Sequence, residues 1–194
     1  MSKHKINVWQ WMLSITRNRT QHNRLQNSID SNIMRLKEKI VPRAFLGFVD
    51  IHLAEHCNLN CYSCDNFSQL AKKGYYDIES FSKDIKRLQE LTDGCIERFH
   101  LMGGEPLLNK NCIQYFRILR EHFPNSKIWV ITNGILLPKQ EENFWLACSK
   151  YNIELHPTKY PINIDWDMVK SKCQKYNIVL DFLAMVKNIV LRPV

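Results

Sequence analysis

Hydrophobic and polar positions follow two periods that alternate along the chain. Short runs of alternating or clustered apolar residues predict β-strands at residues 48–53, 96–102, 127–132, 153–156 and 178–182. Apolar residues three and four positions apart predict helices at residues 77–94, around 113–119, at 138–151 and from 165 onward. Strands that alternate with helices are typical of βαβ units and therefore of a parallel sheet.

Residues at the boundaries support these elements. Asp77 and Asp165 are good N-cap residues, and Gly94 and Pro124 each follow a predicted helix. The sequence Lys-Tyr-Asn-Ile occurs at residues 150–153 and again 25 residues later, each time where a predicted helix meets a predicted strand. This spacing corresponds to one βα unit. Right-handed crossovers would wrap such units into an open, barrel-like sheet.

The sequence predicts one α/β domain with three segments. Its 194 residues are a usual length for a single domain. We expect a basic N-terminal helical segment at 1–44, a core at 45–183 and a C-terminal tail at 184–194. In the first segment, a helix over residues 23–40 is predicted by one apolar stripe, formed by Leu25, Ile29, Ile33, Leu36 and Ile40. We expect this helix to pack on the outside of the core.

The net charge of +8 is concentrated near the N-terminus. Residues 1–50 hold nine Lys and Arg against three Asp and Glu, and the remainder holds 18 against 16. Such a segment could meet nucleic acid, an acidic partner or anionic lipid, but a solvated face is the interpretation we favour. No transmembrane segment is expected, because no run of about 20 apolar residues occurs. Seven cysteines without a secretion signal predict a cytoplasmic protein.

The candidate chemistry lies in the loop after the first predicted strand. Cys57, Cys61 and Cys64 are separated by three and two residues. Three thiolates so close together favour a compensating cation, and soft sulfur ligands select zinc, copper(I) or iron-sulfur clusters. A four-iron cluster normally takes four cysteines, so three leave one iron open to a small molecule. The alternative is a zinc site completed by His52 or His56.

Three motifs together resemble the radical S-adenosylmethionine (radical SAM) enzymes. The cysteine spacing is that of the family, and it is followed by MGGEP at residues 102–106 and TNG at residues 132–134, each after a predicted strand. The resemblance covers residues 45–181 approximately and implies a partial (β/α) barrel of the radical SAM type, with about five parallel strands and outer helices. It also implies that Cys57, Cys61 and Cys64 bind a 4Fe-4S cluster.

The resemblance further implies a cofactor and a reaction. In the family, the open iron binds the methionine portion of S-adenosylmethionine. The reduced cluster then cleaves this cofactor to methionine and a 5'-deoxyadenosyl radical, which abstracts hydrogen from a substrate. The substrate is unknown, and an electron donor such as flavodoxin or ferredoxin is implied. The protein supplies placement and exclusion of side reactions.

The resemblance assigns several cofactor contacts. Gly103 and Gly104 allow the backbone to approach a ligand closely. The Glu105 carboxylate, or a backbone carbonyl beside it, would accept from the methionine ammonium. Asn133 would lie near the cofactor's sugar or methionine carboxylate. Asn-Gly is also a common turn pair, so a simple turn is the alternative for this last motif.

One position departs from the family's pattern. The residue immediately before the third cysteine is usually an aromatic that contacts adenine, but here it is Ser63. Tyr62 is the neighbouring aromatic and the candidate for this contact. After the fourth predicted strand, His156, Thr158 and Lys159 are expected to face the same rim, where the family places ribose contacts.

The remaining cysteines and the number of predicted strands bear on which kind of family member this chain is. Cys95, Cys112, Cys148 and Cys173 are expected to be buried as small hydrophobic residues. The family's core usually has six βα units, whereas this chain offers about five strands before its tail. The alternative function is therefore a catalytically inactive iron-sulfur or zinc-binding protein, a truncated family member. An RNA-modifying enzyme is suggested only by the basic N-terminus and is not favoured.

Overall fold

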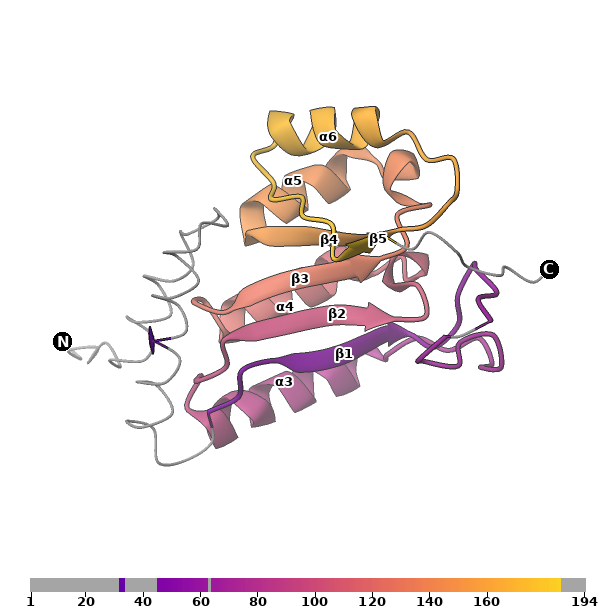
Figure 1. Ribbon diagram of the computed structural model, residues 1–194. Coiled ribbons are helices and arrows are strands. Elements are labelled where there is room, and N and C mark those ends of the chain that lie inside the picture. Colours follow the sequence, from indigo (N-terminus) through magenta and orange to yellow (C-terminus); the bar gives the residue numbers. More distant parts are fainter. Residues whose placement is uncertain (1–31, 34–44, 63, 186–194) are drawn as a thin grey trace.

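The fold is one parallel β-sheet with helices packed on one side. The computed structural model describes residues 32–33, 45–62 and 64–185. Neighbouring strands are parallel and lie side by side in chain order (Figure 1): β1 (Val49–Ala54), β2 (Arg98–Gly103), β3 (Lys127–Thr132), β4 (Ile153–Lys159) and β5 (Ala184–Met185). The predicted α/β fold with about five parallel strands is confirmed.

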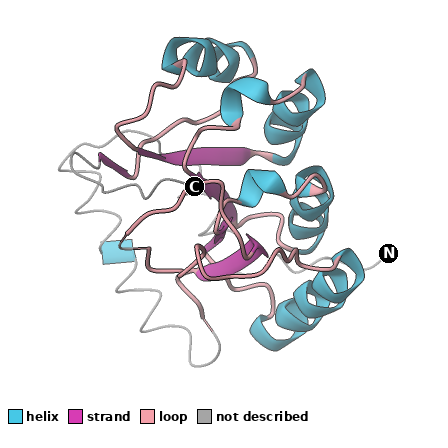
Figure 2. Cartoon of the chain, turned by 90° about the vertical axis from the view of Figure 1, so that its right-hand side faces the viewer, coloured by secondary structure: helices cyan, strands magenta, loops and turns pink. Residues whose placement is uncertain are grey.

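The helices that follow β1 all lie on one side of the row of strands (Figure 2). They are α3 (Ile78–Thr92), α4 (Cys112–His122), α5 (Glu142–Tyr151) and α6 (Trp166–Lys175), with short 3-10 helices η1 (Pro106–Leu108) and η2 (Leu137–Lys139). The predicted caps are present. Asp77 accepts a hydrogen bond from Ser80 N at 2.8 Å, and Asp165 accepts one from Met168 N at 2.9 Å.

The predicted helix at 138–151 is interrupted. Gln140 has an extended backbone, so η2 ends before it and α5 begins only at Glu142. The Gln140 carbonyl accepts from Trp145 Nε1 at 3.2 Å, which holds the break against the first turns of α5.

The core lies between the sheet and the helices. Alternate strand residues on this side, including Leu53, Phe99, Leu101 and Leu155, are fully buried. Phe99 also packs edge to face against Phe123, with ring centroids 4.7 Å apart. The burial of these apolar side chains is the main source of folding free energy.

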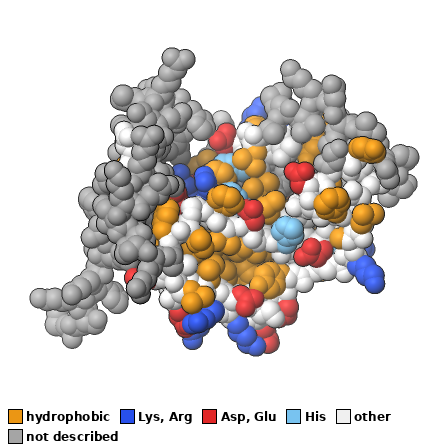
Figure 3. Space-filling model, turned by 60° about the horizontal axis from the view of Figure 1, so that its bottom comes forward, with side chains coloured by type: hydrophobic (Ala, Val, Ile, Leu, Met, Phe, Trp, Pro, Cys, Tyr) orange, Lys and Arg blue, Asp and Glu red, His pale blue; other side chains and the backbone are white. Residues whose placement is uncertain are grey.

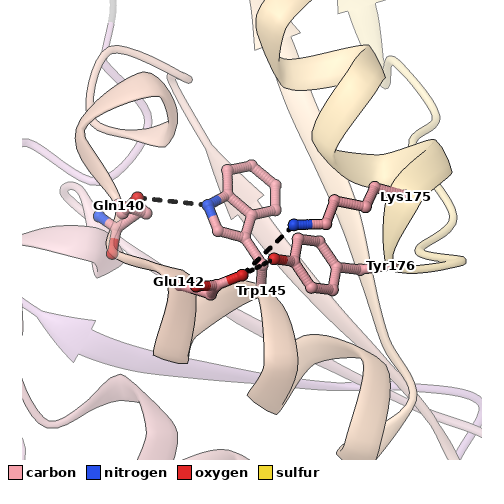
Figure 4. A network of polar contacts seen from close by, with 5 residues as sticks. All are labelled: Gln140, Glu142, Trp145, Lys175 and Tyr176. Atoms are coloured by element: carbon pink, nitrogen blue, oxygen red, sulfur yellow. Dashed lines mark hydrogen bonds and ion pairs between the residues drawn. The ribbon is translucent and has the colours of Figure 1, made fainter.

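The repeated Lys-Tyr-Asn-Ile sequence marks equivalent helix ends, as predicted. Asn152 and Asn177 have left-handed backbones, with φ of 51° and 53°, a conformation that Asn tolerates at the end of a helix. The two units are also joined at their surface (Figure 4): Glu142 of α5 accepts from Tyr176 and lies 3.3 Å from Lys175 Nζ. The repeat therefore marks equivalent positions in two successive units of the fold.

The strand predicted at residues 178–182 is wrong in position. Only an isolated bridge at Leu180, opposite Leu155, falls in that range, and regular pairing with β4 begins at Ala184. The chain does run along β4, because Leu183 N donates to Pro157 O at 3.1 Å. Phe182 packs edge to face on Trp166 of α6, and this contact accompanies the irregular path.

The predicted segments at the two ends lie largely outside the described residues. Of segment 1–44 and its predicted helix at 23–40, only Asn32 and Ile33 are described, and both are helical. The sheet includes Ala184–Met185, two residues beyond the predicted limit of the core. The three-segment division stays a prediction. Within the part of the chain that the structure describes, no helix is long and apolar enough to span a membrane.

Candidate cofactor site at the carboxyl ends of the strands

The cysteine loop leaves the carboxyl end of β1 and is fastened to β2 (Figure 1). Asn66 Nδ2 donates to Gly103 O at 2.7 Å, and Glu105 N donates to His56 O at 3.1 Å. Near the loop's end, Tyr76 N donates to Leu53 O at 3.3 Å, so the chain returns along β1. The loop is thus held at both of its ends.

Two glycines make this close packing feasible. Gly103 has a φ of +123°, and a Cβ there would lie 2.2 Å from Ala54 O. At Gly104 a Cβ would lie 2.2 Å from His56 O. Any side chain would collide with backbone atoms at both positions, so the glycines let the second motif lie directly against the start of the cysteine loop.

The three motifs meet at one pocket of about 240 Å³. Cys57, Cys61 and Cys64 line it from the loop, and Gly103 and Gly104 line it from the end of β2. Residues at the ends of β3 and β4 complete the wall, among them Asn133, Thr158 and Tyr160. Ligands of open α/β sheets bind at this edge, beyond the carboxyl ends of the strands.

The electrostatics of the thiols favour a bound cation. Burial raises the pKa of Cys57, although Leu59 N and the Asn133 amide hydrogen-bond its sulfur at 3.3 and 3.6 Å and oppose that shift. Burial and the negative charge of Cys64 together raise the pKa of Cys61. Three thiolates in this pocket therefore need positive charge beside them.

Three cysteine thiols are soft ligands of the kind that both zinc and iron-sulfur clusters take. Among the described residues, no group of three or more His, Cys, Asp or Glu is placed to hold a single metal ion. In a four-iron cluster each cysteine binds a different iron, so the sulfurs surround the cluster and do not converge on one point. Cys57, Cys61 and Cys64 all line one pocket, so one cluster there could be bound by all of them.

Glu105 joins two of the motifs inside the protein. It is fully buried and accepts hydrogen bonds from Thr132 Oγ1 at 2.7 Å, Asn133 N at 2.8 Å and Leu107 N at 3.1 Å. Burial raises the pKa of Glu105 to about 7, against the opposing effect of these three bonds. Its carboxylate therefore joins the end of β3 to the turn after β2. Glu105 is not among the residues that line the pocket, whereas Gly103 and Gly104 are.

Asn133, a predicted cofactor contact, lines the pocket. Its Nδ2 donates to Asn58 Oδ1 at 2.7 Å and lies 3.6 Å from Cys57 Sγ. Its Oδ1 accepts from Ile135 N at 3.0 Å, so the side chain is held in place by the turn that follows β3.

The structure does not bring Tyr62 to the pocket. Its side chain is 64% exposed, and it is not among the residues that line the cavity. Tyr160, which was not predicted from the sequence, does line it. Burial, followed by the nearby cysteine charges, raises the pKa of Tyr160 to about 12. Of the three residues expected at this rim, Thr158 lines the pocket, whereas His156 and Lys159 are not among its lining residues.

The histidines of the zinc alternative have other partners. His56 Nε2 lies 3.3 Å from the Tyr75 hydroxyl, and His52 Nδ1 lies 3.6 Å from Glu55. His52 lines a separate pocket of about 600 Å³ along the outer edge of β1, which Ile51 and Ile85 also line. Apolar side chains gather on this face of the molecule (Figure 3). Neither histidine lines the cysteine pocket, so the zinc alternative loses its expected fourth ligand.

A pocket lined by three cysteines at the carboxyl edge of a parallel sheet is where an α/β enzyme would bind a metal-containing cofactor. The family model described as the Radical SAM superfamily matches residues 51–156, which is more than half of the chain. The chain therefore belongs to the radical SAM superfamily, a superfamily of enzymes whose members bind a 4Fe-4S cluster and S-adenosylmethionine.

Relatives agree with this membership over part of their length. A GTP 3',8-cyclase of Alkaliphilus oremlandii is 28% identical over 126 residues, which cover 59% of this chain and 37% of that protein. A GTP 3',8-cyclase of Moorella thermoacetica is 33% identical over 93 residues, which cover 47% of this chain and 28% of that protein. The chain thus spans about a third of the length of these curated relatives.

Solved structures share the fold. BtrN in complex with AdoMet and 2-DOIA superposes with a TM-score of 0.56 at 18% identity, over 72% of this chain and 57% of that chain. Native anSMEcpe with bound AdoMet gives a TM-score of 0.54 at 19% identity, over 71% of this chain and 43% of that chain. The predicted partial barrel of the radical SAM type is confirmed.

Proposed function

We propose that Cys57, Cys61 and Cys64 bind a 4Fe-4S cluster and that S-adenosylmethionine binds its fourth iron. The observation that carries this proposal is the single 240 Å³ pocket that all three cysteines line together with Gly103 and Gly104. The three cysteines would hold the cluster, which would supply the electron for reductive cleavage of S-adenosylmethionine and so the radical chemistry of the family.

The surrounding residues would hold this cofactor. The backbone of Gly103 and Gly104 lines the pocket and would offer a carbonyl group to the methionine ammonium. Asn133 would donate to a cysteine sulfur or to the methionine carboxylate, since its amide already lies 3.6 Å from Cys57 Sγ. Tyr160 would pack against the bound cofactor, in the role that the family motif predicted for Tyr62.

The substrate and partners belong to the same proposal. The curated relatives act on GTP by their name, so GTP is the first substrate to test. A low-potential donor such as flavodoxin or ferredoxin would reduce the cluster. A cluster of this kind favours the cytoplasm, where thiols stay reduced.

Electron paramagnetic resonance of the full chain tests the proposal. The chain is reconstituted with iron and sulfide without oxygen, reduced with dithionite and measured with and without S-adenosylmethionine, and 5'-deoxyadenosine is assayed in the same sample. We expect a four-iron signal that changes when S-adenosylmethionine is added, with 5'-deoxyadenosine formed. GTP is then added to test whether it is the substrate from which hydrogen is abstracted.

Two other outcomes would contradict it. A four-iron signal that does not respond to S-adenosylmethionine, without 5'-deoxyadenosine, would favour a catalytically inactive iron-sulfur protein. One zinc per chain, with no iron retained, would favour the zinc-binding alternative.

A further inference from the structure

The outer edge of β1 forms a groove with α3, here called the β1 groove. In the part of the chain that the structure describes, β1 lies at the edge of the sheet and pairs with β2 alone among the strands (Figure 1). The groove has a volume of about 600 Å³ and is lined by residues 49–52 of β1 and by side chains of α3. None of its lining residues lines the cysteine pocket, so the two hollows are separate.

Half of the backbone groups along this edge point away from the sheet. In a parallel ladder only every second residue of a strand exchanges hydrogen bonds with a given neighbour. The N–H and C=O groups of the residues between them therefore face outward on an edge strand. Among the described residues, no hydrogen bond is made to these outward groups along residues 49–52. They open into the groove and are available to another chain.

Beyond this stretch, the same edge already holds a returning piece of the chain. Tyr76 N donates to Leu53 O at 3.3 Å, and Tyr75 forms an antiparallel bridge with Ala54. Extended backbone therefore pairs with this edge while α3 stays packed beside it. Residues 49–52 are the part of the edge that is left open.

The β1 groove combines an apolar floor with negative charge. Phe81 and Ile85 of α3 are buried and form part of its floor. Three exposed carboxylates line the groove, and no lysine or arginine does; they belong to Asp50, Glu55 and Asp84. The groove therefore favours a ligand that carries both apolar and cationic groups.

The same charges disfavour other occupants. Two copies of this chain joined edge to edge at β1 would be related by a two-fold axis, which would bring the carboxylates of both grooves together. Like charges oppose such a contact. Nucleic acid and anionic lipid would meet the same repulsion. A segment that carries positive charge meets none.

We propose that the β1 groove binds an extended peptide of a partner protein in which apolar residues alternate with lysine or arginine. Such a peptide would pair with residues 49–52 and add a strand to the sheet. Its side chains would alternate between the two sides of the sheet. One set would lie over Phe81 and Ile85, on the side of the core, and the other beside Asp50. The inference does not rest on the proposed cofactor.

Fluorescence anisotropy of labelled peptides tests the inference on the full chain, reconstituted with iron and sulfide without oxygen. The probe is a hexapeptide amide of alternating lysine and valine. A serine–valine hexapeptide keeps the apolar set and removes the charge. We expect the lysine–valine peptide to bind and the serine–valine peptide to bind at least about tenfold more weakly, the equivalent of about 1.4 kcal/mol.

Two N-methylated peptides test the backbone pairing. Both keep the lysine–valine sequence, and one carries N-methyl groups on the valine amides, the other on the lysine amides. Only one of these two sets of amides faces β1 in an added strand. We therefore expect one of the two peptides to bind at least about tenfold more weakly than the parent peptide, because its hydrogen bonds to β1 are lost.

A matched pair of variants localises the binding. Asp84→Lys reverses a charge that lines the groove, so it should weaken the lysine–valine peptide at least about threefold. Glu90→Lys is the control, because it makes the same change of charge at an exposed position of α3 that does not line the groove. It should change the affinity by less than about twofold.

Hydrogen exchange followed by mass spectrometry gives a second measurement that needs no variant. The bound peptide should slow exchange in residues 49–52, where the outward amides have no partner in the free chain. Unchanged exchange there would overturn the inference.

Four binding results would also overturn it: the lysine–valine peptide does not bind, the serine–valine peptide binds as tightly, both N-methylated peptides bind as tightly, or Asp84→Lys binds as Glu90→Lys does. Sedimentation velocity of the same samples tests for a second copy in the groove. A dimer that dissociates as the peptide binds would assign the groove to that second copy and contradict the inference.

Discussion

The two faces of the sheet have opposite character. The face toward the helices holds fully buried apolar residues such as Phe99 and Leu101, whereas the other face holds Trp129 stacked between His100 and His156 and, at its carboxyl end, the cysteine pocket. Apolar burial on one face stabilises the fold, whereas the pocket on the other face would hold the proposed cofactor. The same kind of substitution should therefore have different consequences on the two faces.

The largest difference is expected between two cysteine variants. Cys57→Ser removes a proposed cluster ligand, so we expect nearly complete loss of iron after anaerobic reconstitution, measured as iron per chain. Cys148→Ser places a hydroxyl at a fully buried position on the helix side and should retain the iron while lowering the free energy of unfolding by about 1–3 kcal/mol. Full iron content in Cys57→Ser would remove that residue from the cluster.

A second pair of variants compares stability on the two faces within one strand. Phe99→Ala opens a cavity beneath Phe123 and should lower the free energy of unfolding by about 3–5 kcal/mol. Met102→Ala, on the pocket side of β2, should cost less than about 1 kcal/mol because the side chain is only partly buried. Urea unfolding of the reduced, metal-free chain measures both. Equal losses would mean that the pocket face also supports the fold.

The helix side of the sheet could be predicted from the sequence because it depends on local pattern. Apolar periodicity predicted β3 with its observed bounds, and the caps Asp77 and Asp165 predicted the starts of α3 and α6. The last strand was misplaced, because residues 178–182 have strand-like composition but follow an irregular path, in which Phe182 packs on Trp166. Such contacts between distant residues leave no periodic signal.

The pocket face was predicted only where a motif marks it. The spacing of the cysteines and the paired glycines identified the loop and the turn that meet in the structure. The sequence did not predict that Glu105 accepts hydrogen bonds from Thr132 and Asn133 inside the protein, or that Tyr160 lines the pocket. Both features depend on how the ends of β2, β3 and β4 come together. The stacking of Trp129 between His100 and His156 was not predicted for the same reason, because these residues lie on three different strands that are distant along the chain.

The pH dependence of stability tests the role of Glu105, which joins the turn after β2 to the end of β3. Its pKa is about 7 in the fold against an ordinary value of 4.5, so between these pH values the folded chain keeps a proton that the unfolded chain has lost. The free energy of unfolding should therefore fall by up to about 3 kcal/mol as pH rises from 4.5 to 7, and little further above 7. Glu105→Gln cannot titrate and should lack this component.

The measurement for Glu105 is a difference between two chains. Urea unfolding of the unchanged protein and of Glu105→Gln at about pH 5, 6, 7 and 8 cancels the contribution of groups that titrate alike in both, such as histidines. The stability of the unchanged chain should decline relative to the variant as pH rises. A constant difference would mean that the three donors from Thr132, Asn133 and Leu107 keep the pKa of Glu105 near its ordinary value.

The smallest effect is expected on the affinity for S-adenosylmethionine, when variants of Tyr160 and Tyr62 are compared. Tyr160 lines the cysteine pocket, so Tyr160→Ala should weaken S-adenosylmethionine binding about tenfold, and Tyr160→Phe, which keeps the ring, by less. Tyr62→Ala is the matched control and should leave the affinity unchanged, because Tyr62 is 64% exposed and outside the lining of the pocket. Titration of the paramagnetic signal with S-adenosylmethionine measures each affinity. If only Tyr62→Ala weakened binding, the adenine contact would lie beside the third cysteine, as the sequence motif alone predicts.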